Sequence, residues 1–348
     1  MGALKQIKLN LETLEYYKDC FDRNGSPKNI EKIKWQFLRS SKIIPLVEMV
    51  YDEGESRIAA IYAVSAVPFK VGSENINGSQ SLDTMTDVNY RGQGLFIKLA
   101  KEVYSKAKDA EVALVYGFPN GNSIYGFQKK LDWNVLDPVP FLIKPLRTGY
   151  FTKRVSWLKF LPNWNLPLLR VLKDKNYKTS SNNFFPSTCD GLWEVFSKDI
   201  QVAVQRNKSY LDWRYIDKPF ENYNIVHSYD IQNRHIGFVV YAVKEKHGGR
   251  MAYIMELIFD PKHPKAAKAL LNNAVKNIKK ENADCILSWC MDHSPNYKAF
   301  KQNLFFKMPE KLRPIELHFG VKSLNEKYRS LISDRKNWYL SYSDSDTV

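Results

Sequence analysis

Four neighbouring residues in the first half of the chain, Arg91, Gly92, Gln93 and Gly94, have the composition of an anion-binding turn. The segment SLDTMTDV before them has the pattern of a strand, and the apolar residues of LFIKLAKEVYSKAKDA after them recur at helical spacing. The turn therefore joins a strand to a helix start, where backbone N–H groups and the positive end of the helix dipole are exposed. Glycines lack the Cβ atom that would keep an anion away from these groups. The turn is predicted to bind a phosphate, with Arg91 adding positive charge.

The composition limits the class of protein. The chain has 348 residues, enough for two or three domains, and 44% of them are hydrophobic, which excludes global disorder. The 52 Lys and Arg residues against 37 Asp and Glu give a formal net charge of +15. This excess suits an anionic partner such as a CoA-type cofactor, a nucleotide, tRNA or an acidic membrane face. The lysines are spread along the chain, so a merely lysine-rich surface explains the charge equally well, and a nucleic-acid partner is not expected.

The spacing of the cysteines and histidines does not indicate a metal site. The four cysteines are widely scattered and form no CxxC pair, which predicts a reduced cytoplasmic protein without a structural zinc site. The histidines are not at metal-ligand spacing, so no metal is predicted. The sequence contains no run of the ~18 apolar residues that a membrane span needs, and its first residues lack the apolar core of a secretory signal. No transmembrane segment is expected.

Strands and helices are predicted to alternate in the first half. IPLVEMVYDEG and RIAAIYAVSAVPFKV have the pattern of two strands joined by a turn, and VALVYGFPN has that of a buried strand. NSIYGFQKKLDW resembles a short helix. This order predicts an α/β or α+β fold with a mixed sheet flanked by helices.

Residues 138–190 are rich in proline and aromatic residues. They are predicted to form one further strand and then a connecting arm. The arm could also cover a ligand, or lie on a membrane surface through Trp157, Phe160 and Trp164. A packed connector is favoured, because the segment has no clear amphipathic helix.

The second half repeats the order of the first. HIGFVVYAVKEK parallels RIAAIYAVSAVP, AYIMELIFD parallels SLDTMTDV, and PKAAKALLNNAVKNIKKENA parallels the helix after the glycine turn. CILSWC and NYKAFKQNLFF parallel the buried strand and the short helix. This recurrence indicates a duplication. FDPKHPKAAKAL replaces the glycine turn, so the second copy is predicted to be degenerate.

The glycine turn and its surroundings resemble a known family. YRGQGLFIKLA resembles the acyl-CoA-binding motif of the GNAT superfamily of N-acetyltransferases, Arg/Gln-x-x-Gly-x-Gly/Ala, with Phe96 in place of the last small residue. FPNGNSIYGFQKKLDW looks like the segment that follows this motif in the family. SYLDWRYIDKPFENYNI and NWYLSYSDSD resemble segments of tandem GNAT-like proteins, some of them associated with surface-polysaccharide or amino-sugar modification.

The resemblance implies a tandem fold of two GNAT-like mixed β-sheets flanked by helices, the second copy degenerate. Residues 1–145 would form a domain that binds acetyl-CoA, residues 146–190 a connector, and residues 191–348 a degenerate domain that shapes the acceptor site. Acetyl-CoA would bind once per chain, as a co-substrate, and no metal is implied.

The resemblance also implies roles for single residues. The groups that would hold acetyl-CoA belong to Thr86, Val88, Arg91, Gly92, Gln93, Gly94, Leu95, Phe96 and Asn120, the last either by a bond to the pantetheine arm or, alternatively, as a helix cap. Asp83 and Asp87 are the nearest carboxylates, and either could relay the proton of the amine or be an ordinary strand-end residue. Many family members protonate the leaving thiolate with a Tyr at the position of Gln128. Tyr125, nearly one turn earlier, is the predicted substitute.

These features predict an acyl-CoA-dependent N-acyltransferase whose acceptor is a small-molecule or glycan amine, with an amino sugar of a surface polysaccharide as one candidate. Two alternatives stay open. One is an aminoacyl-tRNA-dependent transferase of the peptidoglycan-bridge type, which is not expected to keep the glycine turn. The other is a non-catalytic CoA-binding protein, which Gln128 would suit. The final residues DSDTV are predicted to be a solvated tail, although some two-domain relatives bring this end into the acceptor cleft.

Overall fold

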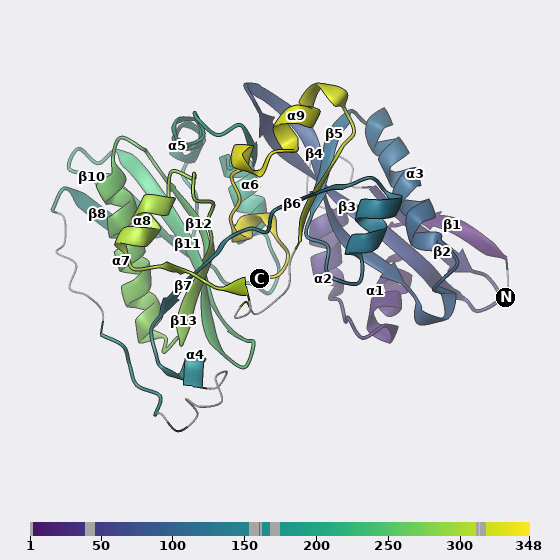
Figure 1. The fold of residues 1–348 in the computed structure, drawn as a ribbon, viewed down its shortest axis with the longest axis horizontal. Coiled ribbons are helices and arrows are strands. Elements are labelled where there is room, and N and C mark those ends of the chain that lie inside the picture. Colours follow the sequence, from purple (N-terminus) through teal and green to yellow (C-terminus); the bar gives the residue numbers. More distant parts are fainter. Residues whose placement is uncertain are drawn as a thin grey trace.

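The computed structural model describes residues 3–38, 46–152, 160, 162–167, 175–310, 313 and 318–348. These residues form two units that lie side by side, each built on one mixed sheet with helices packed against it (Figure 1). The predicted class, two mixed sheets flanked by helices, is confirmed.

The first sheet has the strand order β1-β2-β3-β4-β5-β15-β6, with β9 paired to β3. β2, β3 and β4 are antiparallel, whereas β4 and β5 are parallel and are joined by the crossover helix α3 (Leu95–Asp109). The strands are β1 (Leu4–Lys8), β2 (Leu46–Asp52), β3 (Arg57–Val71), β4 (Glu74–Thr86), β5 (Val112–Gly117), β6 (Asn134–Leu136), β9 (Val202–Val204) and β15 (Phe319–Ser323).

The second sheet repeats this plan in the order β14-β7-β13-β12-β11-β10-β8. Its parallel pair, β12 and β13, is joined by the crossover helix α7 (Pro264–Lys280), so the predicted repeat of elements is present. The strands are β7 (Phe141–Pro145), β8 (Tyr177–Ser181), β10 (Asn224–Asp230), β11 (His235–Lys246), β12 (Gly249–Phe259), β13 (Cys285–Trp289) and β14 (Phe306–Lys307).

The two units exchange strands. β7 comes from the end of the first half of the chain and lies between β13 and β14 of the second sheet. β15 comes from near the end of the sequence and lies between β5 and β6 of the first sheet. β8, inside the predicted connector, pairs with β10 of the second sheet. β9, which also comes after residue 191, pairs with β3 of the first sheet. The predicted boundaries at residues 145 and 191 therefore describe the order of the units along the chain and not the sheet to which these four strands belong.

The longer helices α1, α3, α5 and α7 each bury an apolar face. α3 buries Leu95, Leu99, Val103 and Ala107, the residues whose spacing predicts it. The predicted short helix after β5 is a π-helical turn at Gly126–Lys130. The other helices of the described residues are α1 (Leu14–Arg23), α2 (Ile30–Ile33), α4 (Gly149–Thr152), α5 (Thr188–Phe196), α6 (Lys208–Leu211), α8 (Tyr297–Gln302) and α9 (Arg329–Ile332).

The end of the sequence is part of the core, so the prediction of a solvated tail is wrong. Residues 338–345 are buried, and Trp338 packs edge-on against Phe69 of β3. The acidic Asp344 can be buried because Arg206 pairs with it. Of the tail residues, Asp346 is exposed and Val348 is buried again.

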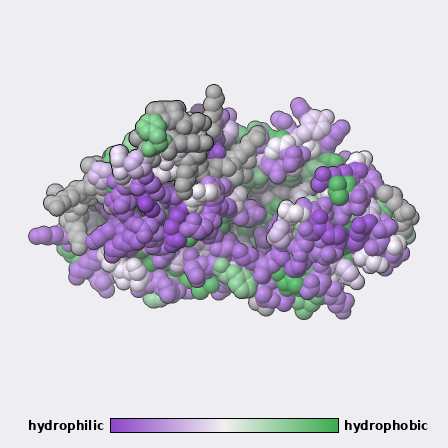
Figure 2. All heavy atoms as spheres, turned by 90° about the horizontal axis from the view of Figure 1, so that it is seen from below, coloured by the Kyte–Doolittle hydropathy of each residue, from purple (hydrophilic) through white to green (hydrophobic). Residues whose placement is uncertain are grey.

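Figure 2 shows the hydropathy of one face of the molecule. Seen from below, the molecule is covered mostly by hydrophilic residues, with apolar residues in small groups (Figure 2). Within the described ranges, none of the helices has both the length and the apolarity to cross a bilayer. Of the aromatic residues in the predicted arm, Phe160 and Trp164 are exposed, and Trp157 lies outside the described residues.

Candidate functional site

The candidate site forms where β4 and β5 separate. The two strands pair from Asn77 opposite Val112 to Ser81 opposite Gly117, where β5 ends. β4 continues to Thr86 and stays paired with β3. No strand of the described chain covers the other edge of β4 after Ser81. The backbone N–H and C=O groups along this edge are therefore available to a ligand.

A β-bulge lies at the same place. The register between β3 and β4 shifts between Tyr62 and Val64, which places one extra residue of β4 at Leu82–Asp83. A bulge bends its strand and redirects a side chain, as is common beside active sites. Asp83, a predicted catalytic residue, is part of this bulge.

Two donors hold the carboxylate of Asp83. Its Oδ2 accepts a hydrogen bond from Tyr17 Oη at 2.7 Å, and its Oδ1 pairs with Lys28 Nζ at 2.5 Å. Burial raises the pKa of the Tyr17 hydroxyl, and the Asp83 charge raises it further, so that this hydroxyl remains a donor. The carboxylate is buried and fixed in orientation next to the open edge of β4.

A cavity of about 970 Å³ connects this edge with the glycine turn. Its walls come from β4, the start of α3, the residues that follow β5, and the loop between α1 and α2. The predicted site residues that line it are Asp83, Thr86, Arg91, Gly92, Gly94, Leu95, Phe96, Asn120 and Tyr125. Three predicted residues are not part of its lining: Val88, Gln93 and Asp87.

The glycine turn has a backbone that suits an anion. Gly92 and Gly94 have φ angles of +80° and +74°, in the left-handed region that strains other residues. A Cβ atom added to either glycine would meet no heavy atom within 4 Å, so the space in front of the turn is open. Leu95 begins α3, whose first N–H groups have no partner inside the helix. The turn therefore fits a phosphate or pyrophosphate group.

Phe96, the departure from the family motif, is accommodated by a glycine. A Cβ atom on Gly126 would lie 2.6 Å from Cε1 of the Phe96 ring, so the ring occupies the place of a side chain at 126. The ring also packs edge-on against Phe127, with centroids 5.1 Å apart. The large residue thus forms part of the cavity wall and leaves the turn itself open.

Asp87 and Val88 bond to other parts of the protein. The Asp87 carboxylate accepts from the N–H of Asn89 at 3.0 Å and lies 3.4 Å from Arg23 Nη2. The N–H of Val88 donates to Oδ1 of Asn24 at 3.1 Å. Of the two predicted carboxylates, Asp83 is therefore the one that faces the cavity.

Tyr125 and Asn120 belong to the wall formed by the residues that follow β5. Tyr125 is 65% exposed, so its hydroxyl is accessible from the cavity that it lines. Oδ1 of Asn120 accepts from the N–H groups of Asn122 and Ser123 at 3.1 and 3.2 Å. This is the capping arrangement that the sequence offered as the alternative to a pantetheine contact.

A hydrogen-bonded group includes Ser81 and Trp133 of the cavity lining. Tyr62 Oη lies 3.1 Å from Ser81 Oγ and 2.7 Å from Tyr104 Oη, to which the indole N–H of Trp133 donates at 2.8 Å. Burial raises the pKa of both tyrosines, so they stay protonated at neutral pH. The Trp133 ring lies against Gly117, at the point where β4 and β5 part, and is part of the cavity lining there.

The described ranges contain no group of three or more His, Cys, Asp or Glu side chains placed to hold a metal ion.

Comparison with known proteins identifies the first unit. Residues 11–136 match the acetyltransferase (GNAT) domain family. This part of the chain is a GNAT domain. Among curated proteins, none matches the sequence.

Solved structures show the same fold over most of the chain. N-myristoyltransferase of Saccharomyces cerevisiae with bound myristoyl-CoA has a TM-score of 0.59 at 12% identity, over 92% of this chain and 83% of that one. A conserved protein of unknown function from Enterococcus faecalis V583, described as a probable N-acyltransferase, has a TM-score of 0.57 at 13% identity, over 93% and 73%. Such low identities show the fold alone. The chain has the two-domain GNAT fold.

The second GNAT-like unit also has a pair of separating strands, but its cleft is filled. β12 and β13 pair as far as Ile254 opposite Ser288, and β12 continues to Phe259. The ring of Tyr342, from the end of the sequence, stacks on Trp289 of β13 with centroids 4.6 Å apart. The chain itself thus occupies the place that is open in the GNAT domain.

Sequence analysis did not single out Tyr17 and Lys28. They lie 66 and 55 residues before Asp83, in α1 and in the loop after it. No local motif marks them. The apolar face of α1, which includes Tyr17, was the one available signal.

Proposed function

We propose that this protein is an acyl-CoA-dependent N-acyltransferase, and that the group it transfers to the nitrogen of an amine acceptor is acetyl. The observation that carries the proposal is a single cavity that runs from the glycine turn to the open edge of β4. An acyl-CoA has its phosphates at one end and its thioester at the other, so it can bind at both places at once. The GNAT family match supports the same assignment.

The glycine turn would hold the pyrophosphate. The N–H groups from Gly92 to Leu95 lie at the start of α3, where the helix dipole favours negative charge. Gln93 would take part through its backbone, and the exposed Arg91 would add a charge-assisted bond.

The open edge of β4 would hold the pantetheine arm. Its free backbone groups can bond to the amides of this arm as a neighbouring strand would. Thr86 lies at the outer end of this edge and Ser81 at the inner end, where β5 leaves. The thioester is therefore expected beside the bulge that carries Asp83. Val88 is not expected to bond the pantetheine arm, because its N–H already donates to Asn24.

The residues at the point where β4 and β5 part support acetyl as the transferred group. Trp133 and Ser81 line the cavity there, and a long acyl chain would have to pass them to continue between the strands. The acyl group proposed for this chain is therefore shorter than the myristoyl group of the myristoyl-CoA bound in its structural neighbour.

Two side chains would move protons. The amine must be neutral to attack the thioester carbonyl, and Asp83 would receive its proton directly or through a water molecule. Lys28 and Tyr17 position this carboxylate. Tyr125 would donate a proton to the departing thiolate. An amino sugar of a surface polysaccharide stays a candidate acceptor.

Release of free CoA thiol from acetyl-CoA, measured with a panel of primary amines, tests the proposal. Acceptor-dependent release with acetyl-CoA, and slower release with myristoyl-CoA, is the expected result. Faster reaction with myristoyl-CoA would contradict the short acyl group. CoA binding without release would indicate a non-catalytic CoA-binding protein, and absence of CoA binding would favour a tRNA-dependent transferase.

A further inference from the structure

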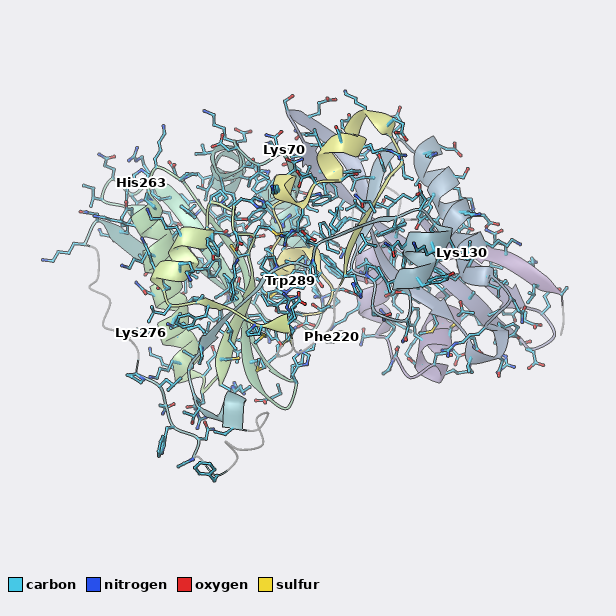
Figure 3. The ribbon with its side chains drawn as sticks, in the orientation of Figure 1. Lys70, Lys130, Phe220, His263, Lys276 and Trp289 are labelled. Carbon is cyan, nitrogen blue, oxygen red and sulfur yellow. The ribbon has the colours of Figure 1, made fainter. Side chains whose placement is uncertain are left out.

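Trp133 is a buried tryptophan that belongs to the cavity lining, with 3% of its surface exposed. It follows the π-helical turn Gly126–Lys130, and Figure 3 shows Lys130 on the GNAT domain, away from the junction with the second unit. The Trp133 ring lies against Gly117, at the point where β4 and β5 part. In the proposed function, an acyl chain longer than acetyl would have to enter this place. The side chains here therefore decide which acyl groups fit.

Two glycines on neighbouring strands lie under the Trp133 ring. Gly117 of β5 and Gly320 of the exchanged strand β15 lie opposite each other in the register. A Cβ atom on Gly320 would lie 2.8 Å from Cε3 of the ring, and one on Gly117 would lie 3.5 Å from its Cη2. The ring thus spans both strands and occupies the space of a side chain at position 320. It has no room to move toward the sheet, because protein interiors are close-packed.

A hydrogen bond fixes the orientation of the ring. The indole N–H donates to Tyr104 Oη at 2.8 Å, and this hydroxyl lies 2.7 Å from Tyr62 Oη. Because these groups are buried, turning the ring away would leave a polar group without a partner. The Phe127 ring also packs against Trp133, with centroids 4.6 Å apart. Trp133 is therefore held in one orientation by the sheet, by Tyr104 and by Phe127.

Trp133 has the one large side chain among the three residues at this point. Ser81 is the last residue of β4 that pairs with β5, and it lines the cavity together with Gly117 and Trp133. Glycine has no side chain and serine has a small one, so the size of residue 133 determines how much space is left beside them. An acyl chain that entered here would collide with the indole ring. The ring cannot move aside without losing its contacts with Tyr104 and Phe127.

We propose that Trp133 determines the length of the acyl group, because its ring occupies the space that the third and later carbons of a longer chain need. The inference rests on the proposed N-acyltransferase function and names the residue that sets the acyl specificity of the same site. Leucine at position 133 keeps this place apolar and leaves room for several methylene groups. Each methylene group buried there tightens binding about fourfold.

Calorimetric titration with acetyl-CoA and hexanoyl-CoA tests this inference without an acceptor. The native protein is expected to bind acetyl-CoA tenfold or more tightly than hexanoyl-CoA. Trp133→Leu is expected to reduce this preference at least tenfold. Trp193→Leu is the matched control and keeps the preference. Trp193 is also 3% exposed and its indole N–H donates to Gln205 Oε1 at 2.5 Å, but it lies in α5 and is not part of the cavity lining.

The affinity for CoA itself, measured first, shows that each variant is folded and has an intact glycine turn. Trp133→Phe, which is expected to reduce the preference threefold or more, replaces Trp133→Leu if that variant does not bind CoA. The inference is overturned if the native protein binds both thioesters equally, or if the preference is unchanged in the Trp133 variant. An equal loss of preference in Trp193→Leu also overturns it, because the effect would then come from general loosening of the fold. Absence of CoA binding by the native protein would instead contradict the proposed function itself.

Discussion

Arg206 and Asp344 form an ion pair from which water is excluded, with Nη2 and Oδ2 2.6 Å apart and neither side chain exposed. Arg206 follows β9, which pairs with β3 of the GNAT domain, and its Nε bonds Glu256 of β12 at 2.7 Å. The backbone O of Asp344 accepts from Nε2 of Gln80 in β4 at 2.7 Å. The ion pair therefore holds the end of the sequence in place between the two sheets, next to the candidate site.

Asp344→Asn is expected to lower the free energy of unfolding by about 3 kcal/mol or more, because it leaves the buried Arg206 charge short of one partner. Urea denaturation measures this. Asp109→Asn, an exposed carboxylate at the end of α3, is the control and should change stability much less. Similar small losses in both variants would mean that the ion pair does not hold the tail.

Gly94→Ala should raise the Kd for acetyl-CoA tenfold or more, because its Cβ enters the space that the phosphates need. Gly248 is a matched control, since its φ of +73° is close to the +74° of Gly94 and its Cβ would also meet no atom within 4 Å. Both variants bear a backbone strain of about 1 kcal/mol. Gly248 lies in the turn between β11 and β12, so Gly248→Ala should leave the Kd unchanged. If both variants bind acetyl-CoA with the same affinity, the glycine turn does not bind the phosphates and has only a structural role.

Asp83→Asn is expected to lower kcat about a hundredfold or more while the Kd for acetyl-CoA hardly changes, as for the loss of a proton acceptor. Asp87→Asn should leave kcat within a few-fold of the native value and lower the melting temperature instead, because Asp87 bonds Asn89 and Arg23 and does not line the cavity. Steady-state kinetics and thermal unfolding on both variants separate the two roles. If kcat fell in Asp87→Asn and not in Asp83→Asn, Asp87 and not Asp83 would be the proton acceptor.

Tyr125→Phe should lower kcat roughly ten- to a thousandfold if its hydroxyl protonates the thiolate. The affinity for acetyl-CoA should barely change, because the hydroxyl matters once charge develops on sulfur. The residue is 65% exposed, so thermal stability should be kept. Gln128→Tyr in the same background should restore part of the rate. An unchanged kcat in Tyr125→Phe would show that the thiolate leaves without its help.

The elements around the site could be predicted because they are local. The apolar spacing of α3 and the glycine run at residues 92–94 are features of adjacent residues, and both appear in the structure as predicted. The roles given to the site residues remain predictions.

The features that sequence analysis missed depend on contacts between distant segments. β15 pairs with β5 across about half the chain, and no local pattern distinguishes an exchanged strand from one that stays in its own sheet. Asp83 and Asp87 have the same chemistry and similar neighbours in sequence, and they differ because the bulge in β4 turns one of them toward Tyr17 and Lys28. The tail has the polar composition of a solvated end, and it is buried because Arg206 meets Asp344.

Calorimetric titration of acetyl-CoA into the full chain tests the central claim most directly, namely that the GNAT domain binds acyl-CoA at the glycine turn and that the second unit does not. The cavity is open in the first unit, and in the second the corresponding place is occupied by Tyr342. The account predicts saturable binding with one site per chain, weakened tenfold or more by Gly94→Ala. Two equivalent sites, or no saturable binding, would contradict it.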